Sequence, residues 1–195
     1  MRIMQREMSH SALVFTLAIG AFVLAPHASD AATKDEQRAE QRKISAETLQ
    51  SLYQVQPKAK QAIEKAAGYA TFANFGMKIL VAGGGKGQGV AVNKKTKKET
   101  FMRMVEAQAG LGIGVKKFSL VWVFDNASAL DKFVNSGWEI GGQASATAKK
   151  GEKGEAYTGA MAVSPGVWLY QLAGDGLAVE LTGKGTKYYK DDDLN

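Results

Sequence analysis

Glycine alternates with larger residues between Lys78 and Val92, and this pattern limits what the chain can fold into. The stretch reads KILVAGGGKGQGVAV, and a second copy, GLGIGV, begins at Gly110. Successive side chains of a β-strand point to opposite faces, so a strand here has one face of bare backbone. Such a face allows close approach of a helix, a sheet or a flat ligand, or sharp curvature of the sheet. We therefore predict a structural role for Gly83, Gly84, Gly85, Gly87, Gly89, Gly110, Gly112 and Gly114.

The glycine cluster does not fit the common nucleotide-binding patterns. A phosphate-binding loop needs a glycine, four residues and then Gly-Lys-Ser/Thr. Gly85 and the lysine after it fit, but Leu80 stands at the first glycine position and Gly87 at the hydroxyl position. The dinucleotide pattern G-x-G-x-x-G also fails, because its last position holds Gln88 or Val90.

The residues that the chain lacks exclude several classes of enzyme. There is no cysteine, and the histidines are His10 and His27, both near the N-terminus. Thiol nucleophiles, histidine bases and most zinc or copper sites are thereby excluded from the rest of the chain. We expect no enzymatic activity, no cofactor and no metal. The catalytic alternative is a carboxylate pair, for example among Glu139, Asp175 and Glu180, although no spacing singles out a pair.

Residues 1–31 have the pattern of a secretory signal peptide. Two arginines precede the apolar stretch Ala12–Ala25, whose 14 residues fall short of the roughly 20 that span a membrane. Small residues follow, and we expect cleavage after Ala31 or Ala28. The alternative is an uncleaved membrane anchor. The prediction is a periplasmic or secreted bacterial protein, basic overall with a formal net charge of +6.

Helical patterns dominate the start of the mature chain. Residues 32–47 are predicted to be a charged lead-in, flexible or helical and solvated. Ser45 is the expected N-cap of a first helix, and Pro57 is expected to open a second helical segment that ends at Gly68. This second segment has a face of alanines, which we expect to pack on the glycine-bare sheet.

Strand-like periodicity follows, with one further helix over 127–136. Residues 118–124, FSLVWVF, are nearly all apolar and predict a central strand buried on both faces. The lysine-rich run 94–98 is expected to be a hairpin turn. We predict strands at 69–75, 78–84, 86–93, 99–107, 110–116, 118–124, 138–148, 157–163, 167–173 and 176–183. The fold class is α+β: a glycine-rich, strongly curved antiparallel β-sheet or barrel-like sheet with an N-terminal helical segment and one further helix.

The order of these motifs resembles the SYLF domain family. The motifs are AGYATF at residues 67–72, the glycine cluster 83–89, GLG at 110–112, VWVFDN at 121–126, a glycine pair at 141–142 and a closing aromatic–glycine strand pair. The resemblance covers about residues 48–190 and leaves an acidic tail, 191–195. It implies a non-enzymatic domain that binds membrane lipids, with phosphoinositides favoured in eukaryotic relatives.

Clustered basic residues support an anionic lipid or membrane surface as the partner. Each lysine near an anionic membrane contributes about 1 kcal/mol. The alternative is that these residues are solvated hairpin tips that keep the sheet soluble. Nucleic acid is not expected, since the nearby aromatic residues lie in the apolar strand 118–124. The candidate lipid-binding residues are Lys94, Lys95, Lys97, Lys98, Arg103, Lys116, Lys117, Lys149 and Lys150.

Two functional hypotheses follow from the sequence. The first is a periplasmic lipid-binding protein that uses basic hairpin tips together with a glycine-lined or apolar surface. The second is a structural or interaction protein of the cell envelope that binds an anionic polymer or a protein partner. Trp138 and Trp168 are either core residues or anchors at a membrane interface, with the core as the default. The acidic tail is expected to be a solvated end.

Overall fold

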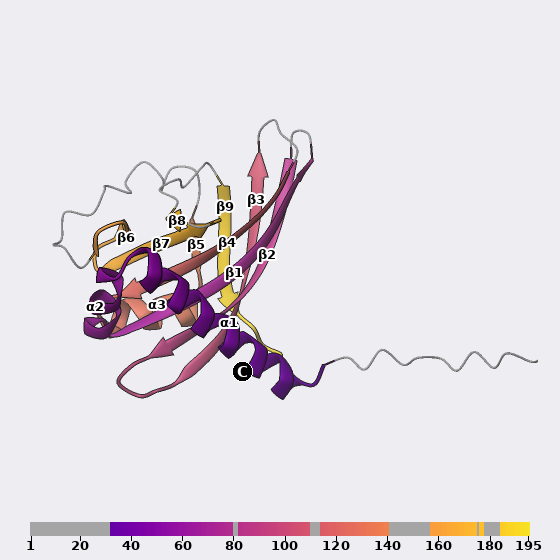
Figure 1. The fold of residues 1–195 in the computed structure, drawn as a ribbon. Helices are drawn as coiled ribbons and strands as arrows, with labels where there is room; N and C mark the ends of the chain where they lie inside the picture. The colour runs from indigo at the N-terminus through magenta and orange to yellow at the C-terminus, as the bar shows by residue number, and fades with distance from the viewer. Residues whose placement is uncertain (1–31, 80–81, 110–113, 141–156, 175, 178–183) are drawn as a thin grey trace, which may run out of the picture. The chain divides into compact units, whose positions relative to one another are not determined.

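The computed structural model of the protein describes residues 32–79, 82–109, 114–140, 157–174, 176–177 and 184–195. These residues belong to one compact unit, Ala32–Asn195. Two helices lead into a run of strands, and a third helix interrupts that run (Figure 1). The elements are α1 Lys34–Val55, α2 Lys58–Lys65, β1 Gly68–Ile79, β2 Ala82–Asn93, β3 Glu99–Ala109, β4 Gly114–Phe124, α3 Ala127–Ser136, β5 Trp138–Ile140, β6 Met161–Ser164, β7 Val167–Ala173, β8 Gly176–Leu177 and β9 Lys184–Lys190.

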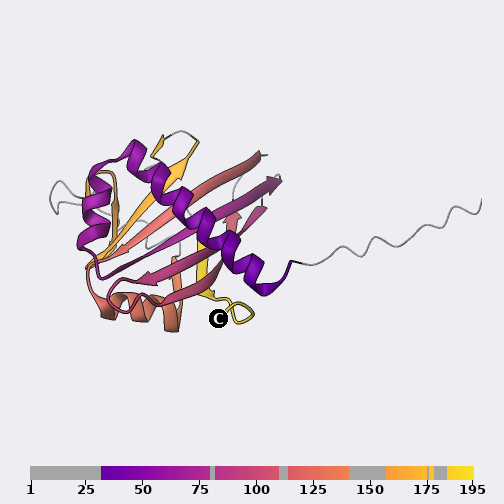
Figure 2. The same ribbon diagram turned by 60° about the horizontal axis from the view of Figure 1, so that its bottom comes forward.

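The described strands form one antiparallel sheet in the order β5-β9-β3-β2-β1-β4-β7-β6, and β8 pairs with β7. The sheet curves strongly, and α1 crosses one of its faces diagonally (Figures 1 and 2). We call the face under α1 and α2 the outer face, which carries Val121 and Trp168; the inner face carries Phe72 and Trp122. The predicted α+β class with a strongly curved antiparallel sheet is confirmed.

The chain enters the fold through α1, which begins eleven residues before the predicted N-cap at Ser45. Thr33 is the N-cap, and it forms a capping box in which its hydroxyl accepts from the backbone N–H of Glu36. Ser45 instead lies within the helix and is buried, where its hydroxyl oxygen accepts a hydrogen bond from the Thr71 hydroxyl at 2.7 Å. The prediction of a helix start at Ser45 is therefore wrong. Of the two states expected for the lead-in, the helical one is observed.

The alanine face of α2 is buried, but not against the glycines. Ala59, Ala62 and Ala66 are at most 6% exposed. Ala59 and Ala66 belong to a cluster with Val121, Trp168 and other side chains of β4 and β7. The expected pairing of the alanine face with the glycine-bare strand is thus wrong. Large side chains on the outer face of β4 and β7 leave more apolar area to bury than the glycines do.

The glycine-bare face of β2 is filled from within the sheet. A side chain at Gly87 or Gly89 would point to the inner face, where Met104 and Phe72 occupy the space. A Cβ on Gly87 would lie 2.6 Å from Cγ of Met104, and one on Gly89 would lie 2.5 Å from Cδ1 of Phe72. Side chains of the neighbouring strands thus occupy the space beside these two glycines. Gly110 and Gly112 lie outside the described residues.

The prediction of one strand over 78–84 is wrong, because its two ends belong to different strands, and other predicted strands are longer in the structure. Residues 78–79 end β1 and 82–84 begin β2, and these strands pair without a break from Gly68 opposite Asn93 to Ile79 opposite Ala82. The predicted boundary at Lys117 is also absent, since β4 continues through it. Continuous pairing gives each glycine a backbone partner, so the strands do not break there. The predicted strand 157–163 begins only at Met161, and residues 141–148 and 178–183 lie outside the described part.

The strand β4 lies at the centre of both cores, as predicted. Residues 120–124 are buried, and their side chains alternate between the inner cluster with α3 and the outer cluster with α1 and α2. The helix α3 has the predicted bounds, and Asn126 caps it by accepting from the backbone N–H of Ala129 at 2.9 Å. Trp138 packs at the inner cluster, and Trp168 is 5% exposed in the outer cluster.

Candidate functional site

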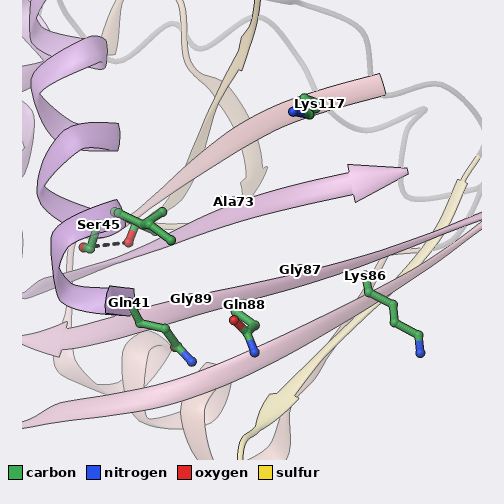
Figure 3. Close-up of a pocket in the computed structure, with 10 residues that line it drawn as sticks. Gln41, Ser45, Ala73, Lys86, Gly87, Gln88, Gly89 and Lys117 are labelled. Carbon is green, nitrogen blue, oxygen red and sulfur yellow. Dashed lines mark hydrogen bonds between the residues drawn. The ribbon is translucent and has the colours of Figure 1, made fainter. Parts of the chain in front are cut away.

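A groove of about 370 Å³ lies on the outer face between α1 and the central strands (Figure 3). Its helix side is built by Gln41, Ile44 and Ser45, which follow one another at the three- and four-residue spacing of one helix face. The strands contribute both small residues, such as Ala73 and Gly89, and long polar ones. The remaining lining residues are Thr71, Ala73, Lys86, Gly87, Gln88, Gly89 and Lys117.

Two lysines stand in one row across the sheet at this groove. Lys86 of β2 and Lys117 of β4 both pair with residue 75 of β1, so they flank the same position of the central strand. Directly paired residues of an antiparallel sheet share a face. Both lysines are exposed and line the groove from the outer face. The arrangement places two positive charges beside an apolar channel.

The groove continues along the same flank of α1 into a second depression of about 580 Å³. Ala73 and Lys117 line both spaces, so the two meet at these residues. Apolar walls come from Val55 at the end of α1 and from Leu172 of β7. Val55 is 39% exposed, one of the large apolar side chains that the described part leaves open to solvent. Together the two depressions form a continuous channel with apolar walls and with Lys117 where they meet.

Gln41 is a buried polar side chain of the groove whose hydrogen bonding is incomplete. The residue is 5% exposed, yet neither its Nε2 nor its Oε1 has a hydrogen-bond partner among the described residues. Figure 3 shows its side chain pointing from α1 toward β2. A buried amide without partners costs about 1–3 kcal/mol, and buried polar groups in native proteins are nearly always paired. Sequence reasoning missed this residue, because a glutamine in a charged helix carries no signal of burial.

The lysines of the 94–98 run do form the predicted hairpin turn, between β2 and β3. Lys94 is turned inward, where its Nζ donates to the backbone carbonyl oxygens of Ile63 at 2.8 Å and of Glu64. Lys94 therefore supplies a hydrogen-bond donor to the free carbonyl groups at the C-terminal end of α2. Lys97 and Lys98 are exposed and line a separate depression of about 700 Å³ beside the first turns of α1. A role of the exposed hairpin lysines in lipid binding stays a prediction.

The structure divides the basic residues that the sequence grouped together. The Lys86–Lys117 row stands at residue 75 of β1, seven rows from Gly68, where the hairpin end of the sheet begins. At about 3.3 Å per residue this is about 23 Å along the strands. Lys116 lies in β4 opposite residue 76, whereas Lys149 and Lys150 lie outside the described residues. The predicted cluster is thus at least two separate groups.

Arg103 is engaged by the acidic tail. Its Nε donates to Oδ2 of Asp191 at 2.8 Å and its Nη2 donates to Oδ2 of Asp193 at 2.9 Å. These contacts raise the pKa of the Arg103 guanidinium above its usual range. The Asp191 side chain is fully buried, and Asn195 donates to the carbonyl oxygen of Phe101 at 2.8 Å. The expectation of a solvated tail is wrong, because Asp191 and Leu194 are buried, and Leu194 packs against Phe101 of β3.

Other classes of site find little support in the described part. Within it, no group of three or more acidic or histidine side chains is arranged to hold a metal ion. None of its helices combines the length and apolar character needed to cross a membrane.

Comparisons with known proteins found a family model and a curated relative that are similar to this chain. Residues 105–195 match the family model Ysc84, whose description is "Las17-binding protein actin regulator". Beta cell expansion factor A of Aeromonas veronii is 37% identical over 145 residues, which cover 73% of this chain and 53% of that protein. The chain thus spans about half the length of this curated relative.

Proposed function

Because the chain belongs to the SYLF family, whose Ysc84 model matches residues 105–195, we propose that it is a non-enzymatic protein that binds anionic membrane lipids. The observation that carries the proposal is the lysine row Lys86–Lys117 beside the apolar groove under α1. A phosphate between two lysines gains charge-assisted contacts, and apolar chains gain by leaving water for Ile44 and Ala73. An anionic amphiphile is the ligand class that uses both features.

The signal-peptide pattern of residues 1–31 supports an exported protein that meets these lipids in the periplasm or outside the cell. The description of the family model concerns Las17 and actin. An exported bacterial protein would not meet actin, so we propose lipid as the ligand that suits its compartment. The absence of cysteine, and of histidine after His27, supports binding without catalysis.

Co-sedimentation of the purified protein with vesicles tests the proposal. We expect binding to vesicles that contain phosphatidylglycerol and little binding to pure phosphatidylcholine. High salt should weaken it, because the screening length falls from about 10 Å at 0.1 M to about 3 Å at 1 M. The double variant Lys86→Glu/Lys117→Glu should bind anionic vesicles at least tenfold more weakly, as each lysine contributes about 1 kcal/mol.

A matched control separates the groove from overall charge. Lys60 of α2 and Lys132 of α3 are also exposed, and Lys60→Glu/Lys132→Glu changes the net charge by the same amount. Equal losses in both double variants would contradict a specific lysine row. No binding of the wild-type protein to either vesicle would overturn the proposal. A partner recovered from cell envelopes in that case would favour the alternative of an envelope interaction protein.

A further inference from the structure

The unpaired amide of Gln41 is a feature that packing alone does not explain. It is buried in the wall of the groove, and its donor and its acceptor both lack partners among the described residues. Ser45 and Thr71, which also line the groove, form a hydrogen bond with each other at 2.7 Å. Since native proteins rarely leave buried polar groups unpaired, the missing partner of Gln41 points to a bound molecule.

The chemistry of the groove defines what that molecule offers. A primary amide presents an N–H donor and a carbonyl acceptor side by side, so the ligand needs an acceptor and a donor close together. Ile44, Ala73 and the glycine backbone supply the apolar part of a groove of about 370 Å³, which offers space for one alkyl chain. Lys86 and Lys117 line the same groove, so the ligand should also carry an anionic group next to the part that bonds Gln41.

We propose that the groove under α1 binds one molecule of a lysophospholipid, with Gln41 as the residue that recognises its glycerol. The ester carbonyl of such a lipid accepts a hydrogen bond from Nε2 of Gln41, and its free glycerol hydroxyl donates one to Oε1. The single acyl chain follows the apolar channel toward Val55. The phosphate lies at Lys86 and Lys117. A diacyl phospholipid fits less well, because its second ester removes the hydroxyl and its second chain needs a second channel.

This inference rests on the proposed lipid-binding function. It adds that the lipid has a single acyl chain and that Gln41 forms its hydrogen bonds. Calorimetric titration of the purified protein with lauroyl-lysophosphatidylglycerol below its micelle concentration tests it. We expect one ligand per chain in the wild-type protein and binding at least tenfold weaker in Gln41→Leu. Gln50→Leu is the matched control, because Gln50 lies exposed on the same helix outside the groove, and it should bind as the wild type does.

Thermal unfolding of the free protein shows whether Gln41 serves ligand binding or the stability of the fold. Gln41→Leu removes an amide that has no described partner, so its midpoint should equal or exceed that of the wild type. A lowered midpoint together with unchanged binding would mean that Gln41 serves the fold, and would overturn the inference. Ile44→Trp, which fills the channel, is a second variant that should lose the lysophospholipid.

Two further arms identify the ligand. Laurate has the chain and a negative charge but lacks the glycerol hydroxyl, and we expect it to bind several-fold more weakly. Equal affinity for laurate would overturn the assignment to a lysophospholipid. Wild-type binding to anionic vesicles without binding of monomeric lysophospholipid would overturn this inference alone. Failure to bind vesicles as well would overturn the proposed function with it.

Discussion

The ring of Phe72 occupies the space that a side chain on Gly89 would need. A Cβ on Gly89 would lie 2.5 Å from Cδ1 of Phe72 and 2.1 Å from the carbonyl oxygen of Thr71. Phe72 in turn contacts Tyr188 edge to face, with ring centroids 5.0 Å apart. The glycine of β2 therefore lets an aromatic side chain of β1 pack closely against the backbone of its neighbour. This packing explains why glycine alternates along β2.

Gly89→Ala should destabilise the protein strongly. The added methyl group meets a backbone oxygen as well as the Phe72 ring, so relief requires the paired strands to shift. We expect the free energy of unfolding in urea to fall by about 1–3 kcal/mol or more. Gly185→Ala in β9 is the control, because no atom lies within 4 Å of the added Cβ. It should change stability by less than about 0.5 kcal/mol, and an equal loss in both variants would contradict the steric explanation.

Lys94 is predicted to stabilise the fold rather than bind lipid. Lys94→Met removes the donor that serves the carbonyl oxygens of Ile63 and Glu64 at the end of α2. We expect a loss of about 1–2 kcal/mol in the free energy of unfolding, measured in urea. Lys95→Met in the same turn should leave stability unchanged, since Lys95 is exposed. Unchanged stability in Lys94→Met would show that its hydrogen bonds contribute nothing measurable.

The contact of Arg103 with the tail gives a second stability prediction. Arg103→Leu leaves the buried carboxylate of Asp191 without its cation, and we expect a loss of about 2–3 kcal/mol in urea unfolding. Asp193 bonds the same guanidinium, but its side chain is 73% exposed. Asp193→Asn should therefore cost less than about 1 kcal/mol. A reversed order of the two losses would contradict the structural role assigned to Asp191.

Buried tyrosines should make the protein unfold at alkaline pH. Burial raises the pKa of Tyr170 to about 12 and that of Tyr188 well above its usual range. In the unfolded chain tyrosine titrates near pH 10. Because the folded-state pKa values are raised, stability from these groups is complete below about pH 10 and is lost as pH rises above it. Urea unfolding at pH values from about 8 to 11 should show constant stability first and a decline afterwards. The ultraviolet absorbance of tyrosinate should rise together with unfolding.

Local patterns in the sequence predicted several strands of the sheet, but they missed β9, which pairs with β3 and β5. The glycine alternation, the lysine turn and the apolar run 118–124 each report on neighbouring residues, and the structure contains β2, the hairpin and the central strand β4 accordingly. The helix α3 was predicted to the residue, because Asn126 and Gly137 mark both of its ends. These signals need no knowledge of what lies far away along the chain.

The groove could not be predicted, because it depends on long-range placement. The buried stripe of α1 begins with Gln41, Ser45 and Thr48, which are polar and so give no apolar periodicity. The occupant of the space above Gly89 comes from another strand. The hairpin lysines and Lys117 are close in sequence but far apart in the sheet, because β3 runs from the hairpin to the other end, where β4 begins. Lys86 and Lys117 lie in one row only through the register of their strands with β1.

The distance between the hairpin lysines and the Lys86–Lys117 row leads to the last prediction. The hairpin lysines lie about 23 Å along the strands from the Lys86–Lys117 row, more than twice the screening length of about 10 Å at 0.1 M salt. Lipid held at the groove therefore interacts weakly with the hairpin. Lys95→Glu/Lys97→Glu/Lys98→Glu should weaken binding to phosphatidylglycerol vesicles less than Lys86→Glu/Lys117→Glu does, although it reverses one more charge. A larger loss in the hairpin variant, measured by co-sedimentation at equal salt, would move the headgroup contact from the groove to the hairpin.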